Sequence, residues 1–150
     1  MIKALILFIL PFLLSAQADF DIVKDSEWLT DYENALKEAK KEDKNVLVYF
    51  TGSDWCPPCK MLKTDLFDSV EFKTLSKDYV LLYVDMPRNK DLLSPEQMAH
   101  NKQVMGKYNK KGVFPLLKIV NAKGNALDEY SGYSMNGEIQ YHLKLLNKYR

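Results

Sequence analysis

Residues 46–60 read VLVYFTGSDWCPPCK, and this stretch decides the fold. Residues 46–50 are apolar and rich in β-branched and aromatic side chains, which predicts a strand buried on both faces. A short polar segment then leads to Cys56 and Cys59, the two cysteines of the chain. A disulfide between residues this close removes little entropy from the unfolded chain, so the pair calls for a chemical role more than a stabilising one.

The composition is that of one ordinary globular domain, with 150 residues, 47% of them hydrophobic and 27% charged. The chain carries 21 basic and 20 acidic side chains, and without residues 1–18, which include Lys3, the two counts are equal at 20. A domain of zero net charge has no general electrostatic attraction to nucleic acid. We therefore expect no nucleic-acid partner.

Residues 1–18 have the layout of a secretory signal peptide. Lys3 supplies a positive start, residues 4–14 are apolar apart from Pro11, and residues 16–18 (Ala-Gln-Ala) fit a small-x-small cleavage site. We expect export to a bacterial periplasm or another extracytoplasmic space, with an uncleaved N-terminal membrane anchor as the alternative. Residues 19–25 are interpreted as a linker and residues 26–150 as the folded domain.

Helical and strand patterns alternate along this domain. The expected elements are helices over residues 26–43, 57–65, 95–108 and 136–149, a short helix opened by Asp68 or Ser69, and strands over residues 46–50, 79–84, 116–120 and 126–130. Residues 121–124 are predicted to form a hairpin turn and residues 88–91 a solvated loop. This order predicts an α/β fold with a central mixed sheet flanked by helices. The cysteines would then lie at the C-terminal edge of the sheet, where open α/β sheets place their sites.

The motif WCPPCK at residues 55–60, directly after a hydrophobic strand, resembles the active site of the thioredoxin superfamily. Residues 112–115 (Gly-Val-Phe-Pro), just before a strand, resemble the family's cis-proline loop. The order of elements matches that fold over residues 26–149, and the motif region is most similar to exported thioredoxin-like domains, including those that receive electrons from membrane reductases. The resemblance implies a thioredoxin-like fold, a cis bond before Pro115, and a substrate peptide lying along Phe114 and Pro115.

The positions of the cysteines predict different roles for them. If Pro57 begins a helix, Cys56 is its N-cap, where free amides and the helix dipole stabilise a thiolate. Cys59 lies one turn later and is expected to be better buried. We predict that Cys56 attacks a substrate disulfide, that Cys59 resolves the mixed disulfide, and that Trp55 packs beside the sulfurs. No cofactor is expected beyond a redox-active Cys56–Cys59 disulfide.

The two residues between the cysteines indicate whether the protein reduces or oxidises the disulfides of its substrates. Pro57 and Pro58 lack amide hydrogens, so two donors that could stabilise the Cys56 thiolate are missing. A less stabilised thiolate makes the couple less oxidising, which favours a protein-disulfide reductase. Such an enzyme outside the cytoplasm implies protein thiols or disulfides as substrates and a membrane reductase as electron donor. Two alternatives stay open: a disulfide oxidase or isomerase, and a non-catalytic thioredoxin-fold binding or chaperone module.

One feature departs from the thioredoxin pattern. Thioredoxins carry a buried acid in the strand before the motif, and here that place falls to Tyr49 or Phe50, depending on whether residues 51–53 contain a one-residue insertion. Asp54 is expected to lie too near the surface to replace the acid. The group that assists Cys59 is therefore left open.

A metal site is not expected, because a closed zinc site needs four ligands and the two histidines lie far from the cysteines in sequence. We interpret His100 and His142 as surface or helix-face residues. Lys60 stands where haem attachment would require a histidine. A purely structural disulfide is the remaining alternative for the cysteine pair.

Overall fold

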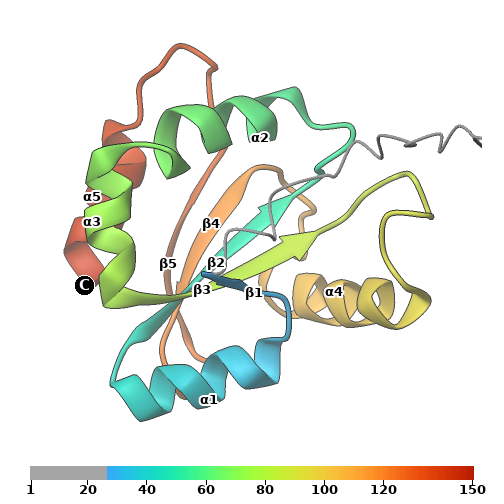
Figure 1. Cartoon of the computed structure of the whole chain (residues 1–150), viewed down its shortest axis with the longest axis horizontal. Coiled ribbons are helices and arrows are strands. Elements are labelled where there is room, and N and C mark those ends of the chain that lie inside the picture. The colour runs from blue at the N-terminus through green and yellow to red at the C-terminus, as the bar shows by residue number, and fades with distance from the viewer. Residues whose placement is uncertain (1–26) are drawn as a thin grey trace, which may run out of the picture.

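The computed structural model describes residues 27–150 (Figure 1). The predicted signal peptide (1–18), the linker (19–25) and the proposed helix cap at Ser26 lie outside the described residues. Among residues 27–150, no helix has both the length and the apolar character needed to cross a membrane.

Helices and strands follow one another in a mixed order along the chain. They are β1 (Trp28–Leu29), α1 (Tyr32–Glu42), β2 (Asn45–Thr51), α2 (Pro57–Leu62), the π-helical segment η1 (Lys63–Phe67), α3 (Val70–Leu75), the 3₁₀ turn η2 (Ser76–Asp78), β3 (Tyr79–Asp85), α4 (Pro95–Tyr108), β4 (Leu116–Val120), β5 (Ala126–Ser131) and α5 (Gln140–Tyr149). The predicted α/β class and most predicted elements are confirmed.

Within residues 27–150 the strands form one mixed sheet in the order β1-β3-β2-β4-β5. β1 and β2 run parallel to β3, while β4 is antiparallel to both β2 and β5. β2 and β3 are paired from Asn45–Tyr79 to Thr51–Asp85, so both strands end at the same edge. The chain enters the cysteine motif from that edge, as predicted.

The sheet separates two apolar cores, because β2 and β3 carry apolar side chains on both faces. α2, α3 and α5 cover one face, and α1 and α4 cover the other (Figure 1). Tyr49 belongs to the core under α2, α3 and α5, whereas Phe50 points into the opposite core. Neighbouring residues of one strand therefore serve different faces.

The first helix is shorter than predicted. Trp28 and Leu29 form the edge strand β1, paired with Leu81 and Leu82, instead of the first turn of a helix. α1 starts only after Asp31, whose carboxylate accepts a hydrogen bond of 2.7 Å from the amide of Asn34. Helical spacing alone could not reveal that β3 leaves an open edge at which Trp28 can pair and pack.

The last helix also starts later than predicted, at Gln140 instead of residue 136. Residues 132–139 form a loop that includes Gly132 and Gly137 with positive φ, a conformation incompatible with a continuing helix. The predicted hairpin turn is confirmed, since the amide of Gly124 donates to the carbonyl of Asn121 over 2.8 Å.

Candidate active site at the cysteine motif

Cys56 and Cys59 form a disulfide at the point where β2 leads into α2. Their Cα atoms are 5.3 Å apart. Cys56 is the N-cap of α2 and Pro57 is the first helical residue, as predicted. Both cysteines are nearly covered, with 3% of Cys56 and 1% of Cys59 exposed, so the expected contrast in burial is small in this oxidised form.

The start of α2 offers few amide donors. Pro57 and Pro58 have none, and the next two amides, those of Cys59 and Lys60, both donate to the carbonyl oxygen of Cys56 at 3.1 and 3.2 Å. Backbone donors that a helix of another sequence would present to the Cys56 sulfur are therefore absent or already bonded within the first turn.

The predicted cis-proline loop lies beside the motif. The Phe114–Pro115 peptide bond is cis, which confirms the expectation. The Phe114 ring meets the Trp55 ring edge to face, with centroids 5.5 Å apart. On the other side, the amide of Gly132 donates to the carbonyl of Pro115 over 2.8 Å, which ties this loop to the end of β5.

Trp55 is held by contacts that the sequence did not reveal. Its indole lies so close to Gly52 that a Cβ at that position would be 2.3 Å from the ring. The indole N–H donates to the carbonyl of Met86 over 2.8 Å, and the guanidinium of Arg88 lies 4.4 Å from the ring centre. Gly52, Met86 and Arg88 thus belong to the site.

Asp54 connects the same two loops. Its carboxylate accepts hydrogen bonds from the amide of Arg88, at 3.0 and 3.1 Å, and from the amide of Asn89 at 2.8 Å. Burial opposes ionisation, but the amides of Asn89 and Arg88 outweigh it, so the pKa of Asp54 is lowered. The start of the predicted solvated loop is therefore fastened to the motif.

A buried acid does exist near the motif, on the neighbouring strand. Asp85 ends β3, is 5% exposed, and accepts hydrogen bonds from the amide and the hydroxyl of Ser53 at 2.9 and 2.5 Å. Burial raises its pKa, against the opposing effect of the bonds from Ser53. Sequence reasoning missed Asp85 because its pairing with Thr51 depends on how β2 and β3 align.

The structure also decides which residue of β2 faces the second cysteine. The hydroxyl of Tyr49 donates to the carbonyl of Cys59 over 3.1 Å, whereas Phe50 lies in the opposite core. Burial raises the pKa of Tyr49, so its phenol stays protonated at neutral pH. A neutral hydrogen-bond donor occupies the position below Cys59.

The two histidines have different surroundings. His100 accepts a hydrogen bond of 3.0 Å from the amide of Tyr32 and is partly exposed, as expected. His142 is not a surface residue: it is 2% exposed and packs against the rings of Tyr130 and Tyr133. The sequence placed His142 correctly on a helix but not on its buried face. Residues 27–150 contain no group of three or more His, Cys, Asp or Glu side chains arranged to hold a metal ion.

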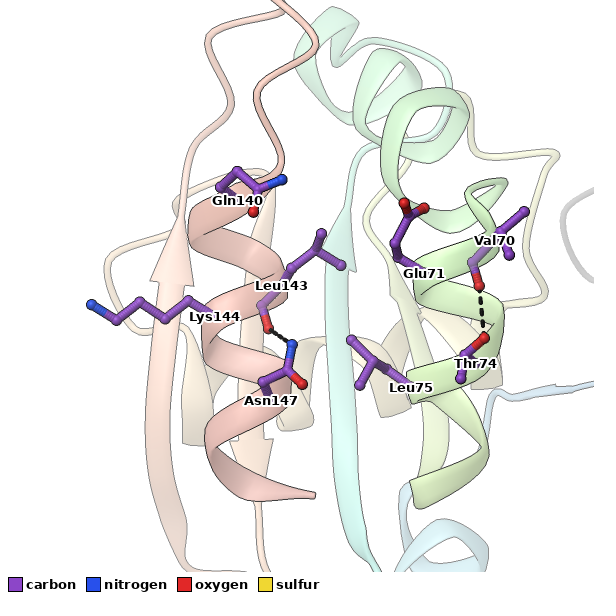
Figure 2. A pocket seen from close by; sticks show the side chains of 8 residues that line it. All are labelled: Val70, Glu71, Thr74, Leu75, Gln140, Leu143, Lys144 and Asn147. Carbon is purple, nitrogen blue, oxygen red and sulfur yellow. Dashed lines mark hydrogen bonds between the residues drawn. The ribbon is translucent and has the colours of Figure 1, made fainter.

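A separate groove lies between α3 and α5 (Figure 2). Leu75 and Leu143 form its apolar floor, and Thr74 and Asn147 donate to carbonyl groups of their own helices. None of the predicted site residues lines it.

The fold and the site together define a thioredoxin-fold protein with a CxxC disulfide, Cys56–Cys59, at the start of α2. Residues 27–122 match the family described as Thioredoxin-like, and the chain belongs to that family. It is 31% identical over 115 residues to the disulfide bond reductase DsbH of Chlamydia pneumoniae, covering 76% of this chain and 68% of that protein. It is 36% identical over 59 residues to the thioredoxin-related protein DsbJ of the same organism, covering 39% of this chain and 17% of that protein.

Solved structures agree with this assignment. A DsbH oxidoreductase structure superposes with a TM-score of 0.70 at 31% identity, covering 82% of this chain and 85% of that one. The C-terminal domain of Neisseria meningitidis DsbD, in the oxidised form, has a TM-score of 0.56 at 21% identity, covering 79% and 92%, and supports the fold alone. The family, the disulfide and the DsbH relative support a thiol–disulfide oxidoreductase.

Proposed function

We propose that this thiol–disulfide oxidoreductase works outside the cytoplasm as a reductase of protein disulfides, with Cys56 attacking and Cys59 resolving. The observation that carries the proposal is the position of the disulfide. Cys56 caps α2 at the carboxyl edge of the sheet and is bonded to Cys59 one turn later. A relative that matches over 76% of this chain is named a disulfide bond reductase.

The reaction starts from the dithiol form. The Cys56 thiolate attacks one sulfur of a substrate disulfide, that S–S bond breaks, and the other substrate sulfur leaves as a thiolate that takes up a proton. Cys59, deprotonated, then attacks the Cys56 sulfur of the mixed disulfide and releases the second substrate thiol. Two electrons and two protons pass to the substrate, and the protein is left with the Cys56–Cys59 disulfide.

The reductase direction rests on Pro57 and Pro58. Because neither has an amide hydrogen, the Cys56 thiolate receives less stabilisation and the oxidised form is favoured relative to a motif with two more donors. The protein therefore gives up electrons readily. The dithiol must be regenerated by another dithiol protein, and for an exported chain we propose a membrane reductase as that donor. Export itself rests on the signal-peptide pattern of residues 1–18.

A trapping experiment tests the order of the two cysteines. The variant Cys59→Ser cannot resolve the mixed disulfide, so it should accumulate mixed disulfides through Cys56. These are detected on non-reducing gels and in mass spectra as adducts that disappear after treatment with a reductant. The matched variant Cys56→Ser should accumulate few adducts. If neither variant forms adducts and the wild-type chain does not reduce a model peptide disulfide, the chain is a binding module and the proposal is wrong.

The reduction potential tests the direction. We expect equilibration with glutathione to place the Cys56–Cys59 couple near the reducing thioredoxins, at about −270 mV. A value near the strongly oxidising end of the family, about −120 mV, would assign an oxidase instead.

A further inference from the structure

A guanidinium group lies over the ring of Trp55, the residue that directly precedes Cys56. The Cζ atom of Arg88 is 4.4 Å from the centre of this ring. A guanidinium stacked on an aromatic face keeps its in-plane N–H donors free, in a fork that matches the two oxygens of a carboxylate. Arg88 is exposed, and among residues 27–150 no carboxylate lies within ion-pair distance of it.

The backbone around Arg88 is held in place from the motif side. The Asp54 carboxylate accepts the amides of Arg88 and Asn89, and the Trp55 indole donates to Met86. These bonds connect the loop after β3 to the residues just before Cys56. A charge that is already positioned loses little conformational entropy when a ligand binds it.

Among residues 27–150, no carboxylate of the two loops (Asp54, Asp85 or Asp91) forms an ion pair with Arg88. The Asp54 carboxylate is occupied by backbone amides, and Asp85 is buried and bonded to Ser53. The nearby Lys60 ammonium donates to the backbone carbonyl of Asp54, over 3.1 Å, and not to a carboxylate. The Arg88 guanidinium therefore lies over Trp55 without a carboxylate partner in the described part of the chain, although the ionised Asp54 carboxylate is bonded to the backbone amide of the same residue.

We propose that Arg88 is a specificity-determining residue that binds an Asp or Glu side chain close to the disulfide of the substrate. This inference rests on the proposed function, because it names which protein disulfides the site prefers. The carboxylate is held by the stacked guanidinium while the substrate cysteine approaches Cys56. Substrates with acidic residues flanking the disulfide are reduced faster than neutral or basic ones.

The test uses three disulfide-bonded peptides with blocked termini that differ only in the residues flanking the disulfide, which are Glu, Gln or Lys. For the reduced wild-type chain we expect kcat/KM for the Glu peptide to exceed that for the Gln peptide by about threefold, the size typical of an exposed ion pair. The preference should shrink in high salt. In Arg88→Gln the Glu-to-Gln ratio falls to about one, while Arg88→Lys retains part of it.

The matched control is Lys90→Gln, which removes one exposed positive charge from the same loop but leaves the cation on Trp55 in place. It should keep the wild-type ratio. Loss of the ratio in Lys90→Gln as well, or a wild-type chain without preference, overturns the assignment to Arg88. A preference for the Glu peptide that persists in Arg88→Gln also overturns this assignment.

An equilibrium measurement separates failure of this inference from failure of the proposed function. Peptides with serine in place of both cysteines are titrated into the oxidised chain, with Trp55 fluorescence or backbone NMR shifts as the readout. Tighter binding of the Glu peptide to wild type, lost in Arg88→Gln, supports recognition even if no peptide is reduced. Equal binding of all three peptides rejects it.

Discussion

The hydroxyl of Tyr49 donates a hydrogen bond of 3.1 Å to the carbonyl oxygen of Cys59. The donor comes from β2 and the acceptor from α2, so the bond fixes the second cysteine to the sheet from inside the core. Thioredoxins are expected to have an acid in this strand, whereas this chain has a phenol that burial keeps protonated. The contact therefore positions Cys59 and does not remove a proton from it.

Tyr49→Phe should lower both stability and the exchange rate. The Cys59 carbonyl still accepts the amide of Lys63, so loss of the Tyr49 bond alone costs about 0.5–1.5 kcal/mol of unfolding free energy in urea titrations. Because Cys59 is then less well positioned, we expect reduction of a peptide disulfide to slow by about twofold to fivefold. Tyr79→Phe is the control, since its hydroxyl bonds Leu146 over 2.6 Å, away from the motif. Equal exchange rates in the two variants would contradict a positioning role.

Gly52→Ala should displace Trp55. The added Cβ would lie 2.3 Å from the indole, so the ring must move or the loop must shift, at a cost of about 1–3 kcal/mol. We expect a lower urea midpoint and a changed Trp fluorescence spectrum. Gly106→Ala in α4 has no atom within 4 Å of its new Cβ and should instead raise stability by about 0.5–1 kcal/mol. A Gly52→Ala chain as stable as wild type would show that the indole does not need the space.

Pro58→His should make the couple more oxidising. The change restores one amide donor in the first turn of α2 and adds an imidazole that can carry positive charge, and both stabilise the Cys56 thiolate. We expect a lower Cys56 pKa, measured from the pH dependence of alkylation, and a reduction potential higher by about 30 mV or more, a tenfold change in equilibrium constant. Pro95→His in the first turn of α4 controls for the loss of a proline. An unchanged reduction potential would contradict the argument that the two prolines favour the reductase direction.

His142 should make folding stability depend on pH. Burial lowers its pKa below the usual 6.5, and within residues 27–150 neither ring nitrogen has a hydrogen-bond partner. The unfolded chain therefore takes up the proton more readily, so the free energy of unfolding falls as the pH drops below about 6.5. A tenfold difference in proton affinity between the two states is worth about 1.4 kcal/mol.

The variant His142→Phe isolates this contribution. It keeps an aromatic ring against Tyr130 and Tyr133 and has no group to titrate. Urea titrations between pH 8 and pH 5.5 should show a smaller loss of stability in the variant than in wild type. The raised pKa of Asp85 acts in the opposite direction and is present in both chains, so it cancels in the comparison. Parallel pH profiles would exclude His142 as the cause.

Local patterns correctly predicted the elements whose sequences fit only one kind of secondary structure. The apolar strands β2 and β3, the serine cap and proline start of α4, and the placement of Cys56 before Pro57 all followed from neighbouring residues. β1 was missed because Trp28 and Leu29 also fit the apolar spacing of the helix that follows. Their state depends on β3, which lies far along the chain.

The sequence by itself determined the motif chemistry, because the order of Cys56, two prolines and Cys59 sets both the helix start and the shortage of amide donors. The tertiary structure alone decided what surrounds that chemistry. Asp85, Met86 and Arg88 reach the motif because β3 pairs with β2 in one register, and Tyr49 faces Cys59 because α2 covers that side of the sheet. The contacts of Asp85, Met86 and Arg88 with the motif join segments about thirty residues apart, and no local pattern encodes the register that brings them together.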